Sequence, residues 1–142
     1  MKMVANTVLV EQDVAYLESG RSERLDMYRP TTTAGPRPVV IFIHGGAFHT
    51  GSKSSERSRL FSELMAGAGL AVLSIDYALS MNNSGVRRWS AWPRNLLDIA
   101  AAVAFVKQRG REFGLDSDRI VLTGASAGAT LALLAPISHR NN

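Results

Sequence analysis

The sequence predicts an α/β protein, a three-layer α/β/α sandwich with a mostly parallel sheet. Short apolar segments suited to strands alternate along the chain with segments whose apolar residues recur at helical spacing. The segment 39–43 is apolar at every position, which is typical of a strand buried on both faces of a parallel sheet. The order of strand, helix, strand, helix, strand and helix implies parallel strands that are joined by right-handed crossovers.

Two antiparallel strands are expected at the start of the chain. Residues 8–17 and 25–28 have strand-forming composition, and the polar segment 18–22 between them suits a turn. The following segment, 31–38, is expected to be a loop, because its prolines prevent regular strand pairing. The chain is therefore predicted to enter the sheet through a hairpin.

A strand, a helix and a second strand are expected next. The buried strand 39–43 is followed by Ser54 and Ser55, either of which can cap a helix that runs to about residue 66. The apolar residues at helical spacing on this helix are Leu60, Phe61, Leu64 and Met65. Residues 70–75 form the next predicted strand.

The second half of the chain repeats this alternation. The polar segment 78–90 is expected to be irregular, and Pro93 suits the first turn of a helix that runs to about residue 113. The predicted apolar face of this helix consists of Leu96, Leu97, Ala100, Val103, Ala104 and Val106. Residues 120–123 form the fifth predicted strand and lead into a last helix. Residues 1–142 are expected to form a single domain.

Composition is that of a packed globular protein. Hydrophobic residues make up 46% of the chain and charged residues 20%, which is too apolar for a disordered protein. Cysteine is absent, so no disulfide and no thiolate metal site are expected, and neither a metal nor a cofactor is predicted. No signal peptide core is found, and the apolar runs are far shorter than the ~20 residues that span a bilayer, so we expect a cytoplasmic protein without membrane insertion.

The positive charge does not indicate a nucleic-acid partner. Sixteen lysines and arginines against twelve acidic residues give a net charge of +4, but the basic residues are scattered along the chain. The one basic cluster that contains aromatic residues is 87–94. A nucleic-acid-binding protein is expected to concentrate its positive charge in a stripe. No nucleic-acid binding is therefore predicted.

Ser126 lies between two glycines in the pentapeptide 124–128, Gly-Ala-Ser-Ala-Gly, where a predicted strand meets a predicted helix. A tight turn of this kind exposes one hydroxyl, and its flanking positions must be small because bulk would block the turn. Ser126 is therefore predicted to be a catalytic nucleophile. The alternative is a serine that caps the helix.

A second motif, His-Gly-Gly-Ala at 44–47, follows the buried strand 39–43. Glycines at a strand end allow bare backbone N–H groups to approach a ligand closely. The N–H groups of Gly45, Gly46 and Ala127 are therefore predicted to form an oxyanion hole, which stabilises the negative oxygen that develops during acyl transfer. The alternative is a Gly-Gly turn that only ends a strand.

Further stretches accompany the two motifs in a fixed order. They are Ile75-Asp76-Tyr77 at a strand end, Trp92-Pro93 before the long helix, and 116–120 before the pentapeptide. With them, the chain from about residue 25 to 134 resembles the α/β-hydrolase superfamily, in the esterase and lipase branch related to hormone-sensitive lipase. The resemblance implies a partial α/β-hydrolase fold that ends after the nucleophile-elbow helix.

The same resemblance implies a serine carboxylic-ester hydrolase that forms an acyl-enzyme at Ser126 and acts on a small-molecule ester. His44 is then a loop-shaping residue and not the histidine of the catalytic triad. Ala47 stands where many relatives of this branch have a third glycine.

The acid and the histidine of the triad are expected after the serine in this superfamily. No Asp or Glu follows Ser126, and the one histidine that does, His139, would lie about 15 Å away at the far end of the last helix. For His49, a role on the loop surface or in the lining of the pocket is preferred to that of a makeshift base, because no acid that would orient it is identified. Turn and capping chemistry accounts for Asp98, Asp116 and Asp118. The triad acid and histidine are therefore predicted to be absent from this chain.

The strand 120–123 would form an open edge of the sheet, and such an edge favours association. A homo-oligomer or a complementing chain is expected to cover it. Three explanations of the chain remain open: a truncated hydrolase, one piece of a split enzyme, and a catalytically silent binding or assembly module on the same half-fold.

Overall fold

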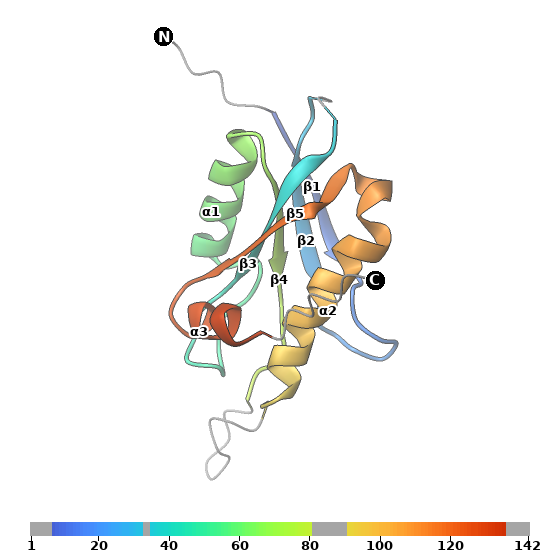
Figure 1. Cartoon of the computed structure of the whole chain (residues 1–142). Helices are drawn as coiled ribbons and strands as arrows, with labels where there is room; N and C mark the ends of the chain where they lie inside the picture. The colour runs from blue at the N-terminus through green and yellow to red at the C-terminus, as the bar shows by residue number, and fades with distance from the viewer. Residues whose placement is uncertain (1–6, 33–34, 81–90, 136–142) are drawn as a thin grey trace.

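A computed structural model of the chain describes residues 7–32, 35–80 and 91–135. Strands and helices alternate along these residues (Figure 1). The elements are β1 (Val8–Val14), β2 (Leu25–Pro30), β3 (Arg37–Ile43), α1 (Glu56–Gly67), β4 (Ala71–Ile75), α2 (Arg94–Arg109), the 3-10 helix η1 (Gly110–Phe113), β5 (Leu115–Gly124) and α3 (Ala127–Leu134). Residues 81–90 of the predicted irregular segment 78–90, and His139, lie outside the described residues.

The sheet is mixed and has the strand order β1-β2-β4-β3-β5. Strand β3 pairs in parallel with β4 and with β5, whereas the hairpin β1-β2 joins β4 in antiparallel orientation. In register, Ile43 lies opposite Ile75 on one side and Gly124 on the other. The carboxyl ends of the three parallel strands therefore meet at one edge of the sheet, where ligands commonly bind in open α/β folds.

Helices cover both faces of the sheet, which confirms the three-layer arrangement (Figure 1). Helix α1 lies on one face, where Ala66 packs with Tyr28, Phe42 and Val72. The opposite face carries the larger core, to which α2 contributes Ile99 and Phe105. The other residues at the centre of that core are Leu25, Met27, Val39, Ile41, Ile43, Leu73, Ile75 and, from α3, Leu131. The sheet is therefore buried on both sides, as the apolar segment 39–43 predicts.

The prediction of the buried face of α1 is partly wrong. Phe61 packs on Phe42 with ring centroids 4.5 Å apart, but Leu60 and Leu64 are 59% and 68% exposed. Two serines take the buried positions instead, Ser58 and Ser62. The Ser62 hydroxyl donates to the Ser58 carbonyl (2.7 Å), and this local hydrogen bond makes the burial of a small polar side chain acceptable.

The predicted face of α2 also needs correction. Leu97 is 57% exposed, while Ile99, Ala102 and Phe105 are buried with Leu96 and Val106. The helix is also shorter than predicted, because a 3-10 turn follows it and ends at Gly114, which has φ = 71°. Glycine adopts this left-handed conformation without steric cost.

Two strands begin earlier than predicted. Strand β3 starts at Arg37 inside the predicted loop, and the register shift between Arg37 and Val39 falls at Pro38. Such an irregularity is where a strand tolerates proline. Strand β5 starts at Leu115, opposite Arg37. Among the described residues, no helix is both long and apolar enough to cross a bilayer.

Candidate active site

Ser126 lies between β5 and α3, directly before the first residue of α3, in a conformation that L-amino acids rarely adopt. Its backbone angles are φ = 51° and ψ = −115°, and the residue is exposed. Its side chain makes no capping hydrogen bond to α3, although Ser126 occupies the capping position. The hydroxyl is therefore exposed at the tip of a strained turn and does not cap the N-terminus of α3.

The glycines of the pentapeptide are required by close backbone approach. A Cβ atom at Gly128 would lie 1.9 Å from the carbonyl oxygen of Ile43. A Cβ atom at Gly124 would lie 2.5 Å from the carbonyl carbon of Gly128. The start of α3 therefore sits directly against the carboxyl end of β3, and this packing brings Ser126 to the segment that follows β3.

The Gly-Gly motif lies beside the serine. A Cβ atom built at Gly45 would be 3.5 Å from the Cβ of Ser126 and 2.8 Å from the carbonyl oxygen of Ala125. Gly46 has φ = 133°, and its carbonyl oxygen accepts the N–H groups of His49 (3.1 Å) and Thr50 (2.9 Å). The turn after the glycines is thus closed by hydrogen bonds to Gly46.

The three amides that the sequence predicts as an oxyanion hole are available for a ligand. Within the described part of the chain, no protein acceptor engages the N–H of Gly45, Gly46 or Ala127. A pocket of about 270 Å³ is lined by residues of both motifs, including Ser126, and by the first turn of α1, including Arg57. This arrangement can accept a small group that carries a developing negative oxygen.

His44 is buried beneath the glycines. Its Nδ1 lies 2.6 Å from the carbonyl oxygen of Gly45, which can only accept, so Nδ1 carries the proton. The ring stacks on Tyr77 at 4.4 Å, and the Tyr77 hydroxyl donates to the His44 carbonyl (2.6 Å). Burial lowers the pKa of His44 below its ordinary value of 6.5, so the ring is neutral at pH 7.

Neither described histidine hydrogen bonds to Ser126. His49 is half-buried on the loop after the glycines, and it is not among the residues that line the pocket at Ser126. Asp116 accepts the N–H of Asp118 (2.9 Å), as turn chemistry predicts. The described residues therefore bring the predicted nucleophile and amides together but place no base beside them.

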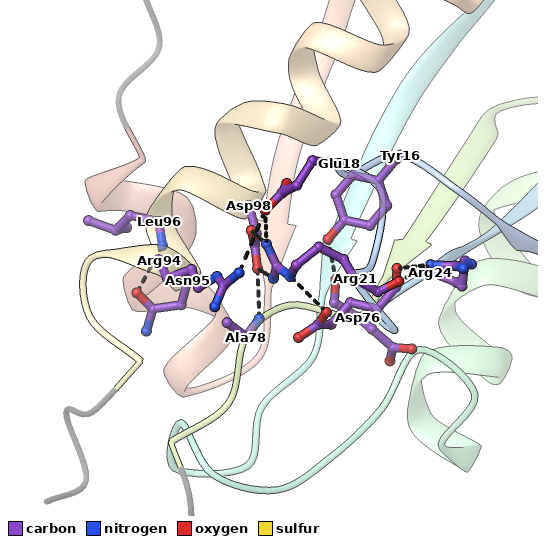
Figure 2. A network of polar contacts seen from close by, with 11 residues as sticks. Tyr16, Glu18, Arg21, Arg24, Asp76, Ala78, Arg94, Asn95, Leu96 and Asp98 are labelled. Carbon is purple, nitrogen blue, oxygen red and sulfur yellow. Dashed lines mark hydrogen bonds and ion pairs between the residues drawn. The ribbon is translucent and has the colours of Figure 1, made fainter.

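Asp98 has a different role from the predicted one. It is 2% exposed, and its two carboxylate oxygens accept hydrogen bonds from the two terminal nitrogens of Arg21, at 3.0 and 2.6 Å (Figure 2). It also accepts the N–H of Ala78 (2.8 Å), and nearby the Tyr16 hydroxyl donates to the carbonyl of Asp76. Capping therefore does not explain Asp98, which lies inside α2. Its hydrogen bonds connect α2 to the turn between β1 and β2 and to the segment that follows β4.

No local sequence pattern predicts this network, because its partners are far apart in the chain. Arg21 and Asp98 are 77 positions apart, and nothing in either local sequence indicates that the two charges meet. The one signal in the sequence is the helical spacing of Asp98 with Ala102 and Phe105, four and seven positions later. An acidic side chain at a helix position that faces the core requires a buried partner.

Comparisons with known proteins point to one family. The sequence profile of the BD-FAE family matches residues 25–142. A probable carboxylic ester hydrolase of Mycobacterium tuberculosis, LipM, is 37% identical over 128 residues, which are 89% of this chain and 28% of that protein. Gut esterase 1 of Caenorhabditis briggsae is 33% identical over 81% of this chain and 21% of its own length.

Solved structures share the fold. Esterase Est22 superposes with a TM-score of 0.75 at 26% identity, over 90% of this chain and 38% of its own. Brefeldin A esterase, described as a bacterial homologue of human hormone sensitive lipase, has a TM-score of 0.75 at 23% identity, over 94% of this chain and 36% of its own. The chain therefore spans well under half the length of each of these relatives.

Proposed function

Because this chain belongs to the BD-FAE family, among the α/β-hydrolase esterases related to hormone-sensitive lipase, we propose that it supplies the nucleophile and the oxyanion hole of a serine carboxylic-ester hydrolase. The observation that carries the proposal is that the Gly45 backbone lies beside Ser126. A Cβ atom built on Gly45 would be 3.5 Å from the Cβ atom of Ser126. The substrate is a small-molecule ester, as the names of the related esterases suggest.

The chemistry follows from this arrangement. The Ser126 oxygen attacks the ester carbonyl carbon, and the carbonyl oxygen becomes an oxyanion that accepts hydrogen bonds from Gly45, Gly46 and Ala127. Collapse of this intermediate releases the alcohol and leaves an acyl group on Ser126, which water then removes. Each oxyanion donor contributes about 3 kcal/mol to transition-state stabilisation. The N-terminus of α3 adds a favourable electrostatic field at the same place.

The reaction also needs a base to accept the Ser126 proton, and we propose that a segment packed on β5 brings the base and its acid. Strand β5 pairs with β3 alone among the described strands. Val121 on β5 is 58% exposed, and Leu133 and Leu134 on α3 are 86% and 53% exposed. A complementing segment or a second copy that covers these residues would bury this apolar surface.

A fluorophosphonate probe tests the proposal, because it reacts with activated serines. We expect slow, stoichiometric labelling of Ser126, with hydrolysis of p-nitrophenyl acetate near background until a complementing segment is supplied. The variant Ser126→Ala is the control and is expected to remove the label. Labelling that survives Ser126→Ala, or labelling of another residue, would show that this serine is not the nucleophile.

A second candidate function is a binding or assembly module that performs no catalysis. It is favoured by the exposed apolar residues on β5 and α3, and by the absence of a histidine partner for Ser126 among the described residues. The two functions predict different results for one variant. A silent module would bind its partner through β5 and would be indifferent to Ser126→Ala, whereas the hydrolase loses all labelling and turnover.

A further inference from the structure

Lys53 is a buried lysine outside the pocket, on the loop that connects the glycine motif to α1. It is 7% exposed, and its Nζ lies 2.6 Å from a carboxylate oxygen of Asp26 on β2 and 2.9 Å from one of Asp13 on β1. Asp26 is itself 1% exposed and also accepts the N–H of Asp13 (3.0 Å). A lysine is rarely buried to this extent without such partners.

The backbone of Lys53 is held as firmly as its side chain. Its N–H donates to the carboxylate of Asp76 (2.8 Å), and its carbonyl accepts the hydroxyl of Ser74 (2.8 Å). Ser74 lies in β4 and Asp76 follows it. The one residue is therefore attached to β1, to β2 and to the carboxyl end of β4.

The anchored residue is directly connected to the predicted oxyanion hole. Two positions before it, a Cβ at Gly51 would lie 2.3 Å from the Gly45 carbonyl oxygen and 2.5 Å from Nδ1 of His44. The loop thus runs from the glycines, passes back against them at Gly51 and is fixed to the sheet at Lys53. Movement of Lys53 would be transmitted to the backbone that carries the two amides.

We propose that Lys53 is a positioning residue for the oxyanion hole, and that its charge holds the loop 44–55 so that the Gly45 and Gly46 amides face Ser126. The role in catalysis rests on the function proposed above. Lifting the loop would separate the buried ammonium group from the buried carboxylate of Asp26, which is costly in a low-dielectric interior. Amides held in advance stabilise an oxyanion without reorganisation, so the ion pairs contribute to rate through the glycines.

Amide hydrogen exchange tests the positioning directly and does not depend on the reactivity of Ser126. The reporters are the N–H groups of His49 and Thr50, which close the turn on Gly46. In Lys53→Met we expect these two amides to exchange at least about tenfold faster, while the amides of β3 and β4 keep their protection. Lys53→Arg is expected to retain most of the protection. The matched control is Lys107→Met, which removes an exposed charge on α2.

Unchanged exchange at His49 and Thr50 would overturn the proposal, and so would faster exchange spread evenly over β3 and β4. If Lys53→Met does not fold, Asp13→Asn decides the matter, because the Asp13 side chain is 73% exposed and its loss leaves Lys53 paired with Asp26. The same two amides are then expected to exchange faster, by a smaller factor, and protection equal to that of the unmodified chain would overturn the proposal.

The rate of Ser126 phosphonylation provides the catalytic readout. We expect Lys53→Met to lower it about tenfold, Lys53→Arg to restore it in part, and Lys107→Met to leave it unchanged. A loosened loop with an unchanged labelling rate would refute the catalytic role of Lys53. If the unmodified chain is not labelled at all, the proposed function fails, while the exchange measurement still decides whether Lys53 positions the loop.

Discussion

Ser126 is held at a positive φ that costs an L-amino acid about 1–3 kcal/mol, and the surrounding structure maintains it. Ala47 and Phe48 share this feature, with φ of 53° and 69°. Three of the four non-glycine residues with a positive φ in the described part of the chain thus fall in the two segments that meet at the candidate site, and the fourth is Asp13 on β1. Strain concentrated in this way is a common property of functional sites, where exposure of a reactive group is retained at the expense of stability.

The strain at Ser126 leads to a stability prediction. Glycine adopts a positive φ without steric conflict, whereas alanine retains the conflict, so Ser126→Gly should unfold at higher urea concentration than Ser126→Ala. We expect a difference of about 1 kcal/mol in the free energy of unfolding. A Ser126→Gly protein that is no more stable than Ser126→Ala would show that the turn is not strained.

The buried imidazole of His44 leads to a prediction about pH. Burial lowers its pKa from 6.5, so below about pH 6.5 the unfolded chain takes up a proton that the folded chain does not. The free energy of unfolding should therefore fall as the pH drops through this range, by at most about 1.4 kcal/mol per pH unit from this group.

The variant His44→Asn, which does not titrate in this range, isolates that contribution. Urea unfolding at pH 7.5 and pH 5.5 should show a smaller loss of stability in the variant than in the unmodified chain. Equal losses in the two proteins would mean that His44 is not held neutral by its surroundings.

Among the secondary-structure elements, the strands and the elbow were predictable from local sequence, and the helix faces were not. Continuous apolar residues identify β3, and glycines around a serine identify the turn before α3. On α1, in contrast, Ser58 and Ser62 displace Leu60 and Leu64 from the buried face, because their hydroxyls find local partners.

The polar anchors of the site could not be predicted for a related reason. Lys53 and Asp26 are 27 positions apart, and only the completed sheet brings the strand and the loop together. The sequence therefore identifies the groups expected to react, whereas the charges that hold their elements in place depend on tertiary contacts that no local pattern contains.

The contact between α3 and β3 predicts that Gly128 is intolerant of any side chain. A Cβ there would lie 1.9 Å from the Ile43 carbonyl oxygen, so Gly128→Ala must push the elbow away from β3. We expect a loss of more than about 3 kcal/mol in the free energy of unfolding. The control is Gly110→Ala, where the nearest atom would be 3.2 Å away and the expected change is within about 1 kcal/mol. Equal stability of the two variants would contradict the close contact.

At the scale of the whole molecule, exposed apolar residues lie on β5 and on α3. We expect the chain to associate through this surface. We expect Val121→Lys combined with Leu133→Lys to abolish self-association or binding of a complementing segment without unfolding the chain. Sedimentation velocity measures the effect. Leu60→Lys, at a 59% exposed position on α1, is the control. Association that resists the double substitution, or that Leu60→Lys reduces equally, would place the interface elsewhere.

Catalysis at this site requires Ser126 and the neighbouring amides to act on one and the same reacting group. A crystal structure of the phosphonate adduct would show whether they do. We predict phosphorus bonded to the Ser126 oxygen, and one phosphonate oxygen about 2.7–3.1 Å from at least two of the nitrogens of Gly45, Gly46 and Ala127. An adduct whose oxygens face solvent away from these nitrogens, or one formed on a different residue, would show that the serine and the amides do not act together.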